Sequence, residues 1–207
     1  KNFWGMRALP MYSLALAPAL IMTIRLAFPL KSQDVGFASV VYAGLFQTFY
    51  LRLAVFFGSV GVFTSLFRGD LLEKSLHYYL LMPVRREVLT IGKYVSGLVA
   101  TLVLFTAGTA LSFVLMYLPY GSQRAGRFFF EGPGIEHLSS YLGVTVLACL
   151  GYGAVFLLMG LLVNNPMIPA ALVLAWESIH FLLPPALRKI SVIHYLLSLC
   201  PVPAPQG

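Results

Sequence analysis

The chain has 207 residues, of which 59% are hydrophobic and only 10% are charged. A soluble globular domain carries about 25% charged residues, so this composition excludes an ordinary soluble domain and indicates an integral membrane protein. The formal net charge of +7 does not point to nucleic acid as a partner, because the basic residues flank apolar runs. In that position they favour retention at the cytoplasmic face of a membrane.

Five apolar runs follow one another along the chain, each long enough for a membrane helix. No alternation with a period of two passes through them, so helices are expected rather than barrel strands. The sequence therefore predicts an all-α, polytopic transmembrane bundle that forms a single domain. The expected spans are residues 8–28, 37–67, 91–118, 139–163 and 167–183, with a cytoplasmic segment at 68–90 and a polar, glycine-rich loop at 119–138.

The flanking Lys and Arg residues favour a cytoplasmic N-terminus, and the inner or plasma membrane is the expected location. In that orientation the densest basic cluster lies in the short cytoplasmic segment between the second and third spans. The cytoplasmic flanks then hold Lys1, Arg7, Arg68, Lys74, Arg85, Arg86 and Lys93, and the opposite side holds Lys31, Arg124, Arg127, Arg188 and Lys189.

The segment 70–93 is the most polar stretch between two apolar spans, and its pattern predicts a short amphipathic helix. Asp70 can act as the N-cap, with Glu73 completing a capping box, and Pro83 ends the helix. Leu72, Leu76, Tyr79 and Leu80 share one face. Two interpretations remain open: a helix that only anchors the loop at the membrane surface, or a coupling helix that docks on a soluble partner.

The same segment resembles the signature region of ABC transporter permeases of the type-2 export class. Those proteins carry an acidic start, then Gly-Thr-Leu-x-x-Leu-Leu, Pro-Val-Ser-Arg, and Gly-Lys opening the third span. The chain departs from this pattern at Lys74, where the family often has Gly, and at Arg85, where Ser is common. The matching residues are Asp70, Glu73, Ser75-Leu76, Leu80-Leu81, Pro83-Val84, Arg86 and Gly92-Lys93, with looser similarity at Trp176-Glu177 and Pro184.

The resemblance implies the membrane-spanning subunit of an ATP-driven exporter, paired with a second permease copy or a related permease, in contact with membrane lipid. ABC ATPase subunits would be its cytoplasmic partners. Family permeases have six spans, so a sixth is expected beyond Gly207. The residues expected to dock on the ATPase are Leu72, Leu76, His77, Tyr79, Pro83, Arg85 and Arg86.

Ionisable residues inside apolar spans are costly and need a partner, water or a route to the interface. Arg25 is close enough to the end of its span to reach the headgroups, whereas Arg52 lies deeper in a long run. Glu177 and His180 are three positions apart and share a helix face. Arg52, Glu177 and His180 are therefore candidates for an interhelical polar contact or for the lining of a translocation pathway. A metal site at Glu177 and His180 is disfavoured, because so few ligand-type side chains accompany them.

The chain has no Gly-x-x-x-x-Gly-Lys-Ser/Thr phosphate loop and no Ser-centred nucleophile elbow. No catalytic residue, cofactor or bound metal is expected, and ATP hydrolysis would come from another polypeptide. Two other classes stay open. One is an intramembrane enzyme, lipid-modifying or proteolytic, which would need a polar cluster at a common depth. The other is a passive membrane scaffold.

Overall fold

The computed structural model describes residues 9–27, 35–63, 86–163, 167–178 and 191–202 of the chain. Within these ranges all regular secondary structure is helical and no strand occurs, so the expected all-α class is confirmed for them. The elements are α1 (Leu9–Ala27), α2 (Val35–Leu45), η3 (Phe46–Val55), α5 (Arg86–Tyr117), η4 (Leu118–Tyr120), α6 (Ser122–Phe130), α7 (Gly134–Leu162), α8 (Met167–Ser178) and α10 (Val192–Ser198).

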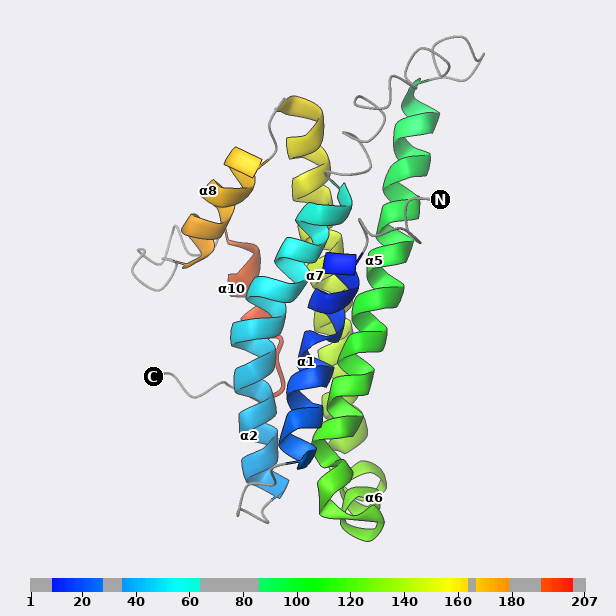
Figure 1. Ribbon diagram of the computed structural model, residues 1–207, viewed down its shortest axis with the longest axis vertical. Helices are drawn as coiled ribbons and strands as arrows, with labels where there is room; N and C mark the ends of the chain where they lie inside the picture. Colours follow the sequence, from blue (N-terminus) through cyan, green and yellow to red (C-terminus); the bar gives the residue numbers. More distant parts are fainter. Residues whose placement is uncertain (1–8, 28–34, 64–85, 164–166, 179–190, 203–207) are drawn as a thin grey trace.

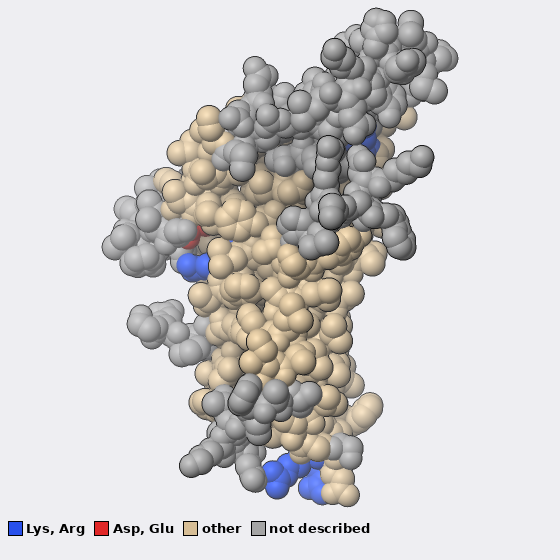
Figure 2. Space-filling model, viewed as in Figure 1, with Lys and Arg blue, Asp and Glu red and all other residues tan. Residues whose placement is uncertain are grey.

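Three helices in these described ranges are long and apolar enough to cross a membrane. They are Gly36–Phe63, Thr90–Tyr120 and Gly134–Met159, with 28, 31 and 26 residues. At about 1.5 Å per residue each exceeds the hydrocarbon thickness of about 30 Å. The other two predicted spans contain the shorter helices α1 and α8. Figure 2 shows few charged side chains along the middle of the molecule, whereas Lys and Arg gather at the end formed by α6.

The centre of the bundle is built from α1, α5 and α7, which run along one another (Figure 1). Gly108 of α5 allows the closest approach, because a Cβ at that position would lie only 2.5 Å from the carbonyl oxygen of Ala15 in α1. In lipid the hydrophobic effect does not drive helices together, so membrane helices associate through close van der Waals packing, which small residues allow.

Buried tyrosine and threonine hydroxyls connect the helices. The Tyr50 hydroxyl donates a 2.6 Å hydrogen bond to the carbonyl oxygen of Phe105, and the hydroxyls of Thr109 and Thr145 are 3.0 Å apart. The hydroxyl of Tyr42 lies 3.1 Å from that of Ser112. These contacts join η3, α2 and α7 to α5, and they satisfy polar groups that lipid could not.

The expected loop at 119–138 is wrong, because most of it is helical. After η4, Gly121 adopts φ +80°, which glycine tolerates without strain, and α6 begins at the next residue. Phe128 of α6 stacks on Tyr117, with ring centroids 4.6 Å apart. Aromatic packing therefore holds this polar segment as a helix against the end of the bundle.

Two other expected boundaries shift. Helix α5 begins at Arg86, although its candidate membrane span begins at Thr90, next to the expected start at 91, and α7 begins at Gly134 rather than at 139. In both places polar residues precede the apolar run, and the helix includes them. The proposed coupling helix between the second and third spans lies almost entirely outside the described residues.

Candidate functional site

Glu177 lies in the last turn of α8 and is only 4% exposed. Its Oε2 atom accepts a 2.8 Å hydrogen bond from the hydroxyl of Tyr152 on α7, and its carboxylate also accepts one from the backbone N–H of Ile193 on α10. A carboxylate in apolar surroundings is costly unless donors surround it. The fold supplies these donors from two other helices.

Arg52, on the π-helical segment η3, completes the polar cluster. Its guanidinium interacts electrostatically with both Glu177 and the Tyr152 hydroxyl. Arg52 and Glu177 each stand out in the sequence as ionisable residues within apolar runs, and in the fold their side chains interact. Opposite charges that interact in this way lower the cost of burying either of them.

Arg52 lies within the π-helical segment η3. The buried residues of this segment form two rows, and within each row successive residues are four positions apart, whereas an α-helix has 3.6 residues per turn. Such wider turns occur often at functional sites. Gln47, in the first turn of η3, donates a 2.7 Å hydrogen bond to the carbonyl oxygen of Val202, after α10. This contact fixes the end of the described chain beside the same helix. The two buried rows are Phe46, Tyr50 and Ala54, and Gln47, Leu51 and Val55.

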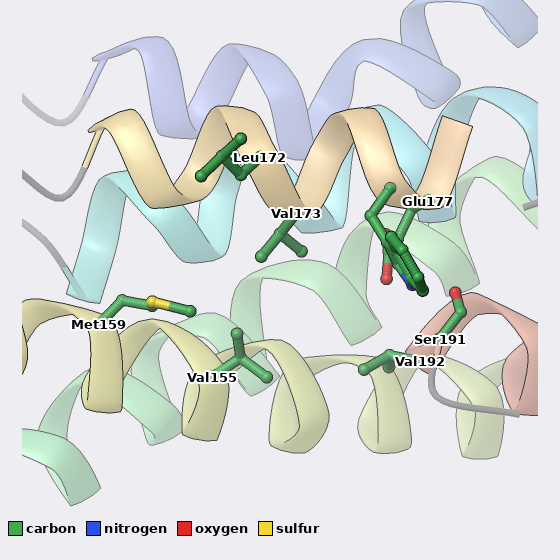
Figure 3. A pocket seen from close by; sticks show the side chains of 8 residues that line it. Val155, Met159, Leu172, Val173, Glu177, Ser191 and Val192 are labelled. Atoms are coloured by element: carbon green, nitrogen blue, oxygen red, sulfur yellow. The ribbon is translucent and has the colours of Figure 1, made fainter. Parts of the chain in front are cut away.

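A cavity of about 360 Å³, open on one side to the surface, lies between α7, α8 and α10, beside the cluster. Figure 3 shows aliphatic side chains from α7 and α8 facing each other across it, with Glu177 and Ser191 at one end. The Ser191 hydroxyl oxygen is buried and has no hydrogen-bond partner. Arg52 is not among the lining residues, which are Val155, Met159, Leu172, Val173, Trp176, Glu177, Ser191 and Val192.

The site lies in one half of the bundle. Tyr152 is about 27 Å along α7 from Gly134 but only about 15 Å from Leu162, at 1.5 Å per residue. The Leu162 end of α7 is the end at which α5 begins (Figure 1). The polar cluster is therefore nearer to the start of α5 than to α6.

Most of the predicted docking residues lie outside the described residues, as does His180. Arg86 is the first residue of α5, and its side chain is not described. Arg25 belongs to α1, and its side chain likewise is not described. The docking residues outside the described ranges are Leu72, Leu76, His77, Tyr79, Pro83 and Arg85.

Sequence reasoning missed Tyr152 and Ser191. Tyr152 stands in an apolar run as one of 11 tyrosines in the chain, so nothing in the pattern separates it from an aromatic core residue. Ser191 lies beyond the last of the five predicted spans, so no apolar run draws attention to it. In the part of the chain that the structure describes, no three His, Cys, Asp or Glu side chains come together as a metal site would require.

The chain matches no protein-family model, no curated protein and no solved structure. Three features of the chain bear on its function: the residue pattern at 70–93, the three long apolar helices in the described ranges, and the polar cluster around Glu177.

Proposed function

We propose that the chain is the membrane-spanning permease subunit of an ATP-driven ABC exporter in the plasma or inner membrane. Its N-terminus lies in the cytoplasm, and a second permease copy or a related permease completes the pathway. Separate ATPase subunits hydrolyse ATP below the membrane. The observation that carries this proposal is the order of residues from Asp70 through Pro83 and Arg86 to Gly92-Lys93, which leads into the long apolar helix that begins at Arg86.

The shape of α5 supports this proposal. It is one continuous helix of 32 residues that starts at Arg86, so the end of the proposed docking segment and the membrane helix are a single rigid element. Pressure applied at Arg86 is therefore transmitted along α5 rather than absorbed by a loop. Because α5 packs against both α1 and α7, tilting it displaces the core of the bundle.

The polar cluster supports a pathway role. Glu177 belongs to the short helix α8, which has few contacts with the rest of the bundle, whereas its donor Tyr152 belongs to the central helix α7. A shift of α7 relative to α8 would lengthen the hydrogen bond between them and change the cavity they share. In this account ATP binding closes the ATPase subunits, α5 moves, and the cavity between α7 and α8 opens or closes.

Site-specific photo-crosslinking of the full chain in its native membrane tests the proposal. A crosslinker is introduced at Ser75, in the proposed docking segment, and a matched one at Gln123, on α6 at the opposite end. The proposal expects a polypeptide with an ATP-binding phosphate loop to be captured from position 75 and not from position 123. Capture of no ATPase from position 75 contradicts it.

The polar cluster also supports a second candidate, an intramembrane enzyme. Glu177, Tyr152 and Arg52 form the polar group at one depth that such an enzyme needs, beside a cavity large enough for part of a lipid. An enzyme would turn over substrate without ATP, and Glu177→Gln would abolish that turnover. A permease would require ATP and its partner for any movement of substrate.

A further inference from the structure

We propose that the cavity between α7, α8 and α10 binds a lipophilic primary amine, with its ammonium group at Glu177 and Ser191 and its apolar body between the aliphatic side chains. The inference concerns binding alone. It therefore stands or falls separately from the proposed coupling to an ATPase.

Size and lining point to a small apolar molecule with one polar end. The cavity holds about 360 Å³, within the range of pockets that take drug-sized ligands. Six of its eight lining residues are Val, Leu, Met or Trp, and the two polar ones, Glu177 and Ser191, lie at the same end (Figure 3). A ligand that is polar throughout would leave its other groups unpaired.

The polar end favours a donor that carries positive charge. The Glu177 carboxylate accepts one hydrogen bond from Tyr152 and one from Ile193, while a carboxylate has about four acceptor positions. The Ser191 hydroxyl is buried, only 2% of the residue is exposed, and its oxygen has no partner. A buried unpaired hydroxyl is costly, so a ligand that pairs with it gains affinity.

Among the described residues, the charge at this end of the cavity favours a cation over an anion. Glu177 faces the cavity, whereas Arg52 interacts with Glu177 without lining the cavity. A bound molecule therefore meets the carboxylate and not the guanidinium. An ammonium group brings three donors, enough for Glu177 and Ser191 together, whereas a fatty-acid carboxylate or a lipid phosphate would face a like charge.

Trp176 lines the cavity and provides a direct readout. The chain has two tryptophans, so Trp4→Phe leaves Trp176 as its single indole fluorophore. The probe is 4-(4-bromophenyl)butylamine, whose bromine quenches indole fluorescence on contact, added to the full chain in lipid nanodiscs. The matched neutral probe is 4-(4-bromophenyl)butan-1-ol.

The proposal expects saturable quenching by the amine, with the alcohol bound about tenfold or more weakly, because it lacks the charge-assisted hydrogen bonds. Glu177→Gln should weaken amine binding by about tenfold or more and bring it close to the alcohol. Ser191→Ala should weaken it about threefold, whereas Ser59→Ala, which removes another buried hydroxyl without a partner, should not.

Equal quenching by amine and alcohol, or quenching that rises linearly without saturation, would mean partition into lipid only and would overturn the proposal. If Glu177→Gln fails to assemble, the comparison of the two probes and the pair Ser191→Ala and Ser59→Ala still decide it. The assignment is contradicted if Ser191→Ala leaves amine binding unchanged and the amine binds no more tightly than the alcohol. This holds whatever the result for Glu177→Gln.

Discussion

The hydroxyl of Tyr152 donates a 2.8 Å hydrogen bond to Oε2 of Glu177, and this bond joins the central helix α7 to the short helix α8. Both residues are buried. Because both partners are buried and breaking the bond would leave each unpaired, the pair restricts how α8 can move relative to α7. The bond is therefore the most direct structural link between the polar cluster and the core of the bundle.

Two substitutions of Glu177 separate the contribution of its hydrogen bonds to stability from that of its side-chain size. Glu177→Leu leaves the Tyr152 hydroxyl and the Ile193 N–H without their acceptor, at a cost of about 1–3 kcal/mol in stability. Glu177→Gln keeps an acceptor oxygen and should lose less. Thermal unfolding in detergent, followed with size-exclusion chromatography to monitor assembly, measures both. Equal behaviour of the Leu and Gln variants would contradict a role for Glu177 as an acceptor.

The tyrosines of α7 provide a matched pair for the hydrogen bond itself. Tyr152→Phe removes the donor to Glu177 and should lower stability by about 1 kcal/mol, in the range of hydrogen bonds between membrane helices. Tyr141→Phe is the control, because the Tyr141 hydroxyl is buried and has no partner, so its removal should be neutral or stabilising. A larger loss in Tyr141→Phe than in Tyr152→Phe would refute this assignment.

Gly108 should tolerate no side chain. In Gly108→Ala the new Cβ would meet the Ala15 carbonyl oxygen at 2.5 Å and the Tyr50 hydroxyl at 2.9 Å, so α1 and α5 must separate. We expect a loss of about 1–3 kcal/mol, as for other overpacked contacts. Gly92→Ala, on the same helix but facing open space, is the control and should be neutral or slightly stabilising. Thermal unfolding of both variants checks this expectation.

The basic segment between the second and third spans should face the cytoplasm. In a background with Cys149→Ser and Cys200→Ser, a cysteine introduced at Ser75 should resist a membrane-impermeant thiol reagent applied to intact cells, and one at Gln123 on α6 should react. Permeabilised cells should label both positions. Labelling at 75 but not at 123 in intact cells would invert the proposed orientation.

The apolar runs allow the helical class and the positions of the long helices to be predicted, because hydrophobic length is the dominant signal in a membrane chain. Arg52 and Glu177 are also predictable, since a charge within an apolar run stands out. The interaction between Arg52 and Glu177 is not predictable, because no residue pattern indicates which helix packs against which. Tyr152 and Ser191 stay hidden for the same reason: their importance comes from the group across the interface, not from their own neighbours.

Local sequence patterns did not predict the secondary structure where aromatic packing outweighs the polar composition of a segment. The segment around Arg124 and Arg127 has the composition of a loop, yet α6 forms because Phe128 and Phe129 pack on Tyr117 and Phe113 of α5. The π-helical geometry of η3 likewise has no sequence signal in its own residues. The helical state of α6 thus depends on ring contacts with α5 that the local composition does not reveal.

Co-purification of an ATPase with the full chain from its native membrane tests the central claim most directly. An ATP-hydrolysing polypeptide should co-purify with the unaltered chain and with the control Arg124→Glu, which changes α6 at the opposite end. It should be lost, or reduced at least tenfold, with Leu76→Asp and with Arg86→Glu, because a docking interface cannot bury an unpaired or inverted charge without a large cost. The two variants must still elute as folded protein. If the ATPase is retained by both variants, or if no ATPase accompanies the unaltered chain, the account of this protein as an ATP-coupled permease is wrong.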